Sequence, residues 1–194
     1  MKPKLIDITV NNLINNLLIF KKKLFKNNII KIAKILDSNI KSKNKILICG
    51  NGGSASQASH FSTELVVRFK KEFEREAHNS ICLASDMGLL TAIGNDYGFD
   101  KIFSRQIEGI AKKNDLLILF STSGKSKNLI HAIKSAKKIG LKTISITGRD
   151  GGNLKKITDL NINIPSNDTA RIQECHLYII HLIIELIETK KFKL

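Results

Sequence analysis

The sequence predicts an α/β protein with a parallel five-stranded sheet that is flanked by helices. From residue 45 onward, short apolar runs alternate with segments of helical periodicity, which is the order expected of repeated strand–helix units. The apolar runs are nearly continuous, as is typical of strands covered on both faces. Two of these runs lead directly into loops rich in glycine or serine that open helices. Ligands of such sheets bind where the carboxyl ends of the strands meet, so both loops are candidate binding sites.

The individual elements follow from the same patterns. Leucine and isoleucine recur at helical spacing before residue 44, which predicts two N-terminal helices over residues 8–43 with a break at Asn27-Asn28. We therefore divide the chain into an N-terminal helical extension (1–44), a cap or oligomer surface, and an α/β domain (45–194). Strands are expected at 45–50, 80–84, 115–120, 142–147 and 160–164, and later helices near 54–70, 101–112, 126–139 and 169–190.

Composition narrows the classes of function. The 194 residues are 42% hydrophobic, enough for one domain with a sizeable core, and no apolar run reaches the ~18–20 residues of a membrane span. The N-terminus lacks the pattern of a signal peptide. Cys49, Cys82 and Cys175 are widely spaced, which favours reduced thiols. We expect a cytoplasmic protein with no membrane partner.

The formal net charge of +15 invites a nucleic-acid interpretation. Against it, the lysines are spread along the chain, and aromatic residues for stacking on bases make up only 6%. We therefore expect no nucleic-acid partner. A general positive field would still attract an anionic substrate.

The first loop reads Gly50-Asn51-Gly52-Gly53-Ser54 and follows a predicted strand. Glycines allow positive φ and close approach of a ligand, and the helix that follows presents unpaired N–H groups to an anion. The segment also fits the G-x-G-x-x-A dinucleotide fingerprint, but the acidic residue expected about 20 positions later is missing. A tight turn without a ligand is a further alternative. We favour phosphate.

The second loop, Ser121-Thr122-Ser123-Gly124-Lys125-Ser126, follows the third predicted strand. It contains Gly-Lys-Ser but is no P-loop, because Leu119 stands where that motif needs its first glycine. Hydroxyls and backbone N–H groups ahead of a helix suit a phosphate monoester. An ordinary helix cap would use the same residues.

Two predicted helices carry side chains suited to proton transfer or metal binding. His60 and Glu64 are four residues apart and share one helix face, as an ordinary surface pair also would. On the last helix, Gln173 is compatible in spacing with both His176 and His181, and periodicity does not choose between them. The loop predicted at 94–98 brings further polar residues, although a plain turn explains its composition equally well.

Several of these segments together resemble the phosphoheptose isomerases of the sugar-isomerase (SIS) superfamily. The resemblance spans residues 47–188 and rests on these segments: Gly50–Ser54, His60-Phe61, Glu64-Leu65, Gly94–Phe99, Ile102–Arg105, Ser121–Gly124, Thr147–Gly152 and Arg171–Glu174. It implies a three-layer, flavodoxin-like fold. It also implies conversion of sedoheptulose 7-phosphate to D-glycero-D-manno-heptose 7-phosphate, for surface polysaccharide such as lipopolysaccharide.

The resemblance further implies a homotetramer with active sites between subunits and one zinc ion per subunit. The implied acid/base pair is Glu64 and His181. The implied metal ligands are His60, Glu64, Gln173 and His181. The implied substrate-binding residues are Asn51, Gly52, Gly53, Ser54, Asn95, Asp96, Ser121, Thr122, Ser123, Ser126 and Gln173.

A related SIS-domain factor that binds a replication initiator is the alternative. It shares a segment like Ala170–Glu174 but resembles this chain less at the helix after the first loop. The carboxylate of Glu64 and the Ser-Thr-Ser-Gly loop favour the isomerase. Ala170 departs from the acidic residue that some isomerases have there, so no role is carried over for it.

Overall fold

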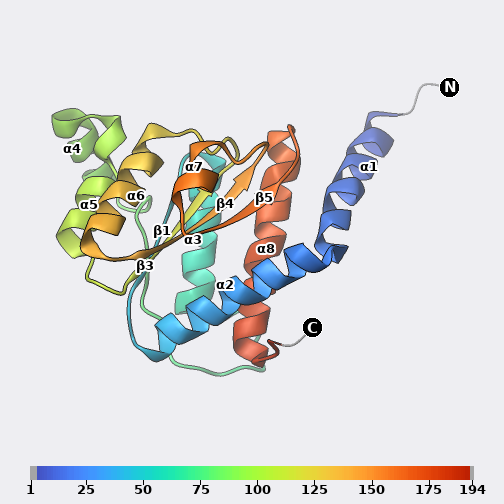
Figure 1. The fold of residues 1–194 in the computed structure, drawn as a ribbon, viewed down its shortest axis with the longest axis horizontal. Helices are drawn as coiled ribbons and strands as arrows, with labels where there is room; N and C mark the ends of the chain where they lie inside the picture. The colour runs from blue at the N-terminus through green and yellow to red at the C-terminus, as the bar shows by residue number, and fades with distance from the viewer. Residues whose placement is uncertain (1–3, 193–194) are drawn as a thin grey trace.

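The computed structural model describes residues 4–192 and confirms the predicted fold class. Its parallel sheet has five strands in the order β2-β1-β3-β4-β5 (Figure 1). The strands are β1 (Ile46–Gly50), β2 (Ser80–Cys82), β3 (Leu116–Ser121), β4 (Lys142–Gly148) and β5 (Leu160–Ile164). All five lie within about two residues of the expected positions, because each is a short apolar run with turn residues at both ends.

Eight α-helices surround this sheet in the described part of the chain. They are α1 (Leu5–Leu17), α2 (Lys23–Lys41), α3 (Gly53–Val66), α4 (Met87–Tyr97), α5 (Ser104–Ile110), α6 (Lys127–Ile139), α7 (Gly152–Ile157) and α8 (Thr169–Thr189), with short 3₁₀ turns η1 (Leu18–Lys21) and η2 (Phe99–Lys101). Between residues 4 and 192, no helix is both long and apolar enough to span a bilayer.

The two faces of the sheet bury separate sets of side chains. Ile46, Ile48 and Ile118 point toward α2, α3 and α8, whereas Leu47 and Leu117 point toward the face covered by α5 and α6. Because successive side chains of a strand alternate in direction, continuous apolar runs are needed to fill both layers. Figure 1 shows the resulting three layers, with α1 projecting away from the body.

Three predicted boundaries are wrong. The N-terminal helices break at the 3₁₀ turn η1, whereas Asn27 and Asn28 lie inside α2. Helix α3 ends at Val66 instead of continuing to residue 70. Residues 94–97, predicted as loop, belong to α4, which begins where the Asp86 carboxylate accepts the Leu89 N–H at 2.9 Å and ends at Gly98 with φ +85°.

Candidate functional site

The first loop joins β1 to α3 in a conformation that depends on its glycines. Gly52 has φ +53°, and a Cβ on Gly50 would lie 2.5 Å from the Ser54 carbonyl oxygen. The Asn51 amide donates to Asn128 at 3.0 Å and accepts from it at 2.8 Å. Asn128 is buried on α6, so this reciprocal pair ties the first loop to the helix that follows the second.

The second loop joins β3 to α6. Ser121 is buried, and its Oγ accepts the Gly124 N–H at 3.0 Å. Thr122, Ser123 and Ser126 are partly exposed, and Ser126 precedes α6 without a side-chain capping bond. The hydroxyls accessible to a ligand are therefore those of Thr122, Ser123 and Ser126. The Ser121 hydroxyl instead stabilises the loop through its bond to Gly124.

Helices α3 and α8 run side by side in the same direction, as helices that follow parallel strands do (Figure 1). Near their N-termini, Gln173 packs onto Gly53 so closely that a Cβ there would lie 2.3 Å from the Gln173 Nε2. Gly53 thus makes room for Gln173 beside the first loop. A second contact between the two helices lies further along, seven positions after Gly53 on α3 and eight positions after Gln173 on α8.

That contact is between two imidazoles. The Nε2 atoms of His60 and His181 are 3.0 Å apart, and the Glu64 carboxylate lies 3.6 Å from the same His60 nitrogen. The structure therefore brings together three of the predicted residues from two helices. Burial lowers the pKa of His181, and the neighbouring His60 lowers it further. A neutral imidazole can both donate and accept a proton, as proton transfer requires.

His176 does not belong to this group; of the two histidines that periodicity left open, the structure places His181 beside His60. It is fully buried between α8 and the sheet, where its ring lies 5.8 Å from that of Phe120. Neither ring nitrogen has a hydrogen-bond partner, and burial lowers its pKa to about 4. His176 is a neutral core residue, whereas His181 contacts His60.

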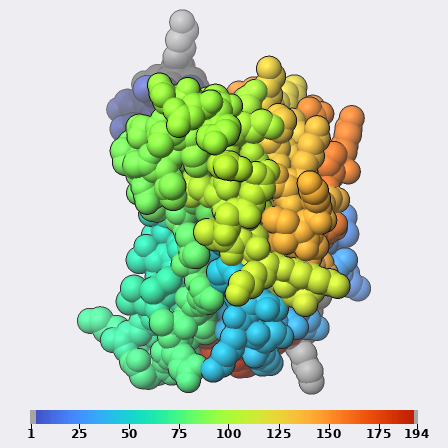
Figure 2. All heavy atoms as spheres, turned by 90° about the vertical axis from the view of Figure 1, so that its left-hand side faces the viewer, coloured from blue at the N-terminus to red at the C-terminus, as the bar shows by residue number. Residues whose placement is uncertain are grey.

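Asn95 and Asp96 lie elsewhere in the chain. Both are exposed on α4, where the Asn95 amide donates to Asp96 at 2.8 Å. Apart from this bond to each other, across residues 4–192 neither forms a hydrogen bond or ion pair with another predicted site residue. Figure 2 shows this face, with α4 in green above the blue-green segment 67–79. A single chain does not join these two residues to the His60–His181 group.

The donor types around His60 suit zinc, which binds imidazole nitrogen and carboxylate oxygen. Two imidazole nitrogens on a tetrahedral zinc are about 3.3 Å apart, close to the 3.0 Å between His60 and His181. Within the residues that the structure describes, however, no three His, Cys, Asp or Glu side chains are grouped tightly enough to hold a metal ion. The spacing of the two imidazole nitrogens suits a zinc ion. At least one more side chain would have to move closer to them to complete a metal site.

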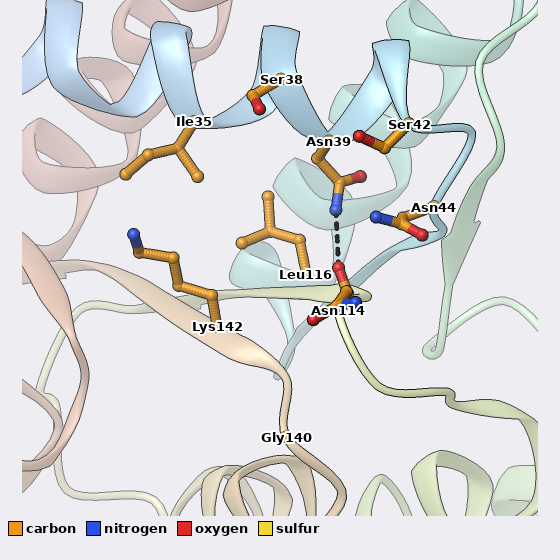
Figure 3. Close-up of a pocket in the computed structure, with 9 residues that line it drawn as sticks. All are labelled: Ile35, Ser38, Asn39, Ser42, Asn44, Asn114, Leu116, Gly140 and Lys142. Atoms are coloured by element: carbon orange, nitrogen blue, oxygen red, sulfur yellow. Dashed lines mark hydrogen bonds between the residues drawn. The ribbon is translucent and has the colours of Figure 1, made fainter.

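Two cavities in the described part of the chain are lined by none of His60, Glu64 and His181. One of about 280 Å³ opens at the amino end of β3 and β4, where it is lined by Asn39, Asn114 and Lys142 among others (Figure 3). The Asn39 amide donates to the Asn114 carbonyl at 3.1 Å. A more apolar cavity of about 580 Å³ lies between β2, α4 and α5, where Asp96 is one of its lining residues.

Known proteins resemble this chain in sequence. The sequence profile of the SIS domain matches residues 11–148. A phosphoheptose isomerase of Aliarcobacter butzleri (strain RM4018) is 51% identical over 160 residues, which cover 82% of this chain and 84% of the relative. One from Helicobacter pylori (strain HPAG1) is 51% identical over 149 residues, or 77% of each chain.

Solved structures show the same likeness. A phosphoheptose isomerase from Francisella tularensis superposes with a TM-score of 0.88 at 32% identity, covering 95% of this chain and 96% of its own. One from Neisseria gonorrhoeae reaches 0.86 at 36% identity, covering 95% and 97%. At these identities and coverages, the likeness extends beyond the fold.

Proposed function

The chain belongs to the phosphoheptose isomerase family of SIS-domain proteins, and we propose how its own residues convert sedoheptulose 7-phosphate to D-glycero-D-manno-heptose 7-phosphate. The observation that carries the proposal is the meeting of His60, Glu64 and His181 between α3 and α8. These two helices begin at the carboxyl end of the sheet, where the glycine- and serine-rich loops also lie. A candidate phosphate anchor and a proton-transfer group are thus carried by elements that begin at the same end of the sheet, which supports isomerisation of a sugar phosphate.

The phosphate is bound by the second loop and the start of α6. Thr122, Ser123 and Ser126 offer accessible hydroxyls, and the first N–H groups of α6 add donors at the positive end of the helix. The Asn51–Asn128 pair holds the first loop against this helix, and the backbone of Gly52 and Gly53 would contact the sugar. Gln173, on α8, packs against Gly53 of the same loop.

Isomerisation moves hydrogen between neighbouring carbons through an enediol. The Glu64 carboxylate removes a proton from C1 of the ketose while the C2 oxygen gains one, and it then returns the carbon-bound proton to C2. The His181 imidazole, kept neutral by burial, passes a proton between the C2 and C1 oxygens. Bonds and protons balance, so no redox partner is required.

One zinc ion per subunit would be held by His60, Glu64, Gln173 and His181. When bound, the ion would supply positive charge against the negative charge that develops on the enediol oxygens. The neutral amide of Gln173 is a weaker ligand than a thiolate, which predicts a metal that exchanges with chelators.

A homotetramer accounts for two features of the single chain. Helix α1 has no buried residue, and its Leu5 and Ile6 are more than 70% exposed. Asn95 and Asp96 lie on α4, away from His60. In an assembly with sites between subunits, α4 of one copy would contribute these residues to the site of another, and α1 would be covered by a neighbour.

The product would enter the synthesis of activated heptose for surface polysaccharide in the cytoplasm. The test is to incubate the purified protein with sedoheptulose 7-phosphate and to resolve ketose from aldose phosphate by anion-exchange chromatography. Appearance of the aldose phosphate with the wild type, and its loss with His60→Ala, supports the proposal. A folded protein that leaves the ketose unchanged, with or without added zinc, would favour the non-catalytic alternative of an initiator-binding factor.

A further inference from the structure

A buried carboxylate near the end of α8 holds the loop that follows α3. Glu188 accepts the backbone N–H groups of Phe69 at 2.9 Å and Lys70 at 3.1 Å. Its side chain is fully buried, and it also accepts from the Arg75 Nε at 3.2 Å. All three donors come from the 67–79 loop, about 115 positions away in sequence, so one carboxylate determines where that loop lies on α8.

Arg75 extends this link to the end of α3. Its guanidinium donates to the Glu64 carbonyl at 2.6 Å and to the Leu65 carbonyl at 2.9 Å. These are carbonyls of the last helical turn, which lack partners within the helix. Arg75 and Glu188 therefore connect the end of the helix that carries His60 and Glu64 to the helix that carries His181. Because the pair is buried, its hydrogen bonds have to offset the cost of desolvation.

The loop held in this way places an aromatic ring on His181. The Phe69 ring stacks on the imidazole with centroids 5.0 Å apart and an interplanar angle of 27°. The imidazole also contacts His60, whose Nε2 lies 3.0 Å from its own Nε2. With an aromatic ring on its face and a second imidazole at its edge, His181 is restricted in rotation about its side-chain bonds.

We propose that Phe69 is a positioning residue, held by Glu188 and Arg75, that keeps the His181 imidazole directed at His60. The inference rests on the proposed function, because it gives His181 a part in the reaction. Phe69 itself lies on neither phosphate-binding loop. Its loss is therefore expected to slow the chemical step and to leave substrate affinity nearly unchanged.

The test compares Phe69→Leu, which removes the ring, with Phe69→Tyr, which keeps it. Phe73→Leu is the matched control, since Phe73 lies on the same loop without a stacked partner among the described residues. We expect Phe69→Leu to lower kcat by about 10- to 100-fold with KM within about threefold. Phe69→Tyr and Phe73→Leu should retain most of the wild-type kcat.

A second readout does not depend on activity. The chain has only five histidines, so its NMR spectrum contains few histidine side-chain signals. The signal that disappears in His181→Ala is that of His181. Ring current from Phe69 shifts this signal, so it should move in Phe69→Leu and, to a smaller extent, in Glu188→Gln. An unmoved His181 signal, an unchanged kcat, or a loss confined to KM would each overturn the proposal. If the wild type itself does not isomerise the substrate, the function fails, while the NMR comparison still decides whether the ring stacks on His181.

Discussion

The Nε2 atoms of His60 and His181 lie 3.0 Å apart although 121 residues separate them in the chain. Parallel packing of α3 and α8 brings them together. Gly53 contacts Gln173 at the start of the two helices, and each histidine follows seven or eight positions later on its own helix. The contact is thus a consequence of repeated strand–helix units, whose helices share one direction. It also places Glu64, one turn beyond His60, at the same junction.

Replacement of Glu64 tests its part in proton transfer. Glu64→Gln keeps the shape of the side chain and removes the base, so kcat should fall by about 10²–10⁴-fold. Circular dichroism and metal content measured on the same sample show whether the variant is folded and loaded. Turnover near that of the wild type in such a sample would exclude Glu64 as the base.

A negative charge in the second loop tests phosphate binding. Ser123→Asp places a carboxylate where the phosphate is expected, and repulsion between the two charges should raise KM at least tenfold. Ser42→Asp adds the same charge at the opposite end of the sheet, beside the cavity of Figure 3, and should leave KM unchanged. Equal KM values for both variants would place the phosphate elsewhere.

Metal analysis shows which of the two histidines of α8 binds zinc. We expect about one zinc per chain, removed by chelator together with activity and restored by added zinc, while most secondary structure persists. His181→Ala should bind less zinc. His176→Met should bind as much as the wild type, because His176 is enclosed in the core. Full activity after complete removal of metal would refute the zinc proposal and leave the acid/base pair to act alone.

Buried histidines predict how stability depends on pH. Burial lowers the pKa of His176 to about 4, and burial together with the charge of Arg75 lowers the pKa of His78 to about 4. An unfolded histidine titrates near 6.5, so the unfolded chain binds more protons between these values. Stability is therefore fully present above pH 6.5 and declines as the pH falls toward 4.

For His176 alone, the loss between pH 7 and pH 5 is about 2 kcal/mol in the free energy of unfolding. Urea unfolding of the wild type and of His176→Met at both pH values isolates it, because other groups such as His78 titrate in both proteins. His176→Met removes the titrating group and two ring nitrogens without partners, so it should be at least as stable as the wild type at pH 5. An equal loss of stability in the wild type and the variant would show that His176 is not held neutral.

Sequence reasoning located those parts of the fold and site that local patterns encode. The strands are short apolar runs, and the two loops are recognisable by their glycines and hydroxyls. The missed end of α3 depends on a distant partner. The chain leaves α3 after Val66 although apolar residues continue, because Glu188 binds the loop from more than 110 residues away. Helix α4 was missed because Gly94 and Gly98 indicated a loop, and its capping residue Asp86 was not recognised as one.

The same limit applies to the site. His60 and Glu64 are neighbours on one helix turn and were found by spacing, whereas the choice of His181 over His176 came from the family resemblance. Asn128 was not anticipated, since its partner Asn51 is 77 positions away. An asparagine just inside the helix after a serine-rich loop was the one available signal. Phe69, in the loop beyond α3, had no signal at all.

The most direct test of the central claim follows the carbon atom that changes. In sedoheptulose 7-phosphate labelled with ¹³C at C1, the label begins as a hydroxymethyl carbon, and in the aldose product it becomes the anomeric carbon. We predict that ¹³C NMR shows the hydroxymethyl signal replaced by an anomeric signal after addition of wild-type protein, and at least 10²-fold more slowly with Glu64→Gln. An unchanged hydroxymethyl signal with folded, zinc-supplemented wild-type protein would contradict the account.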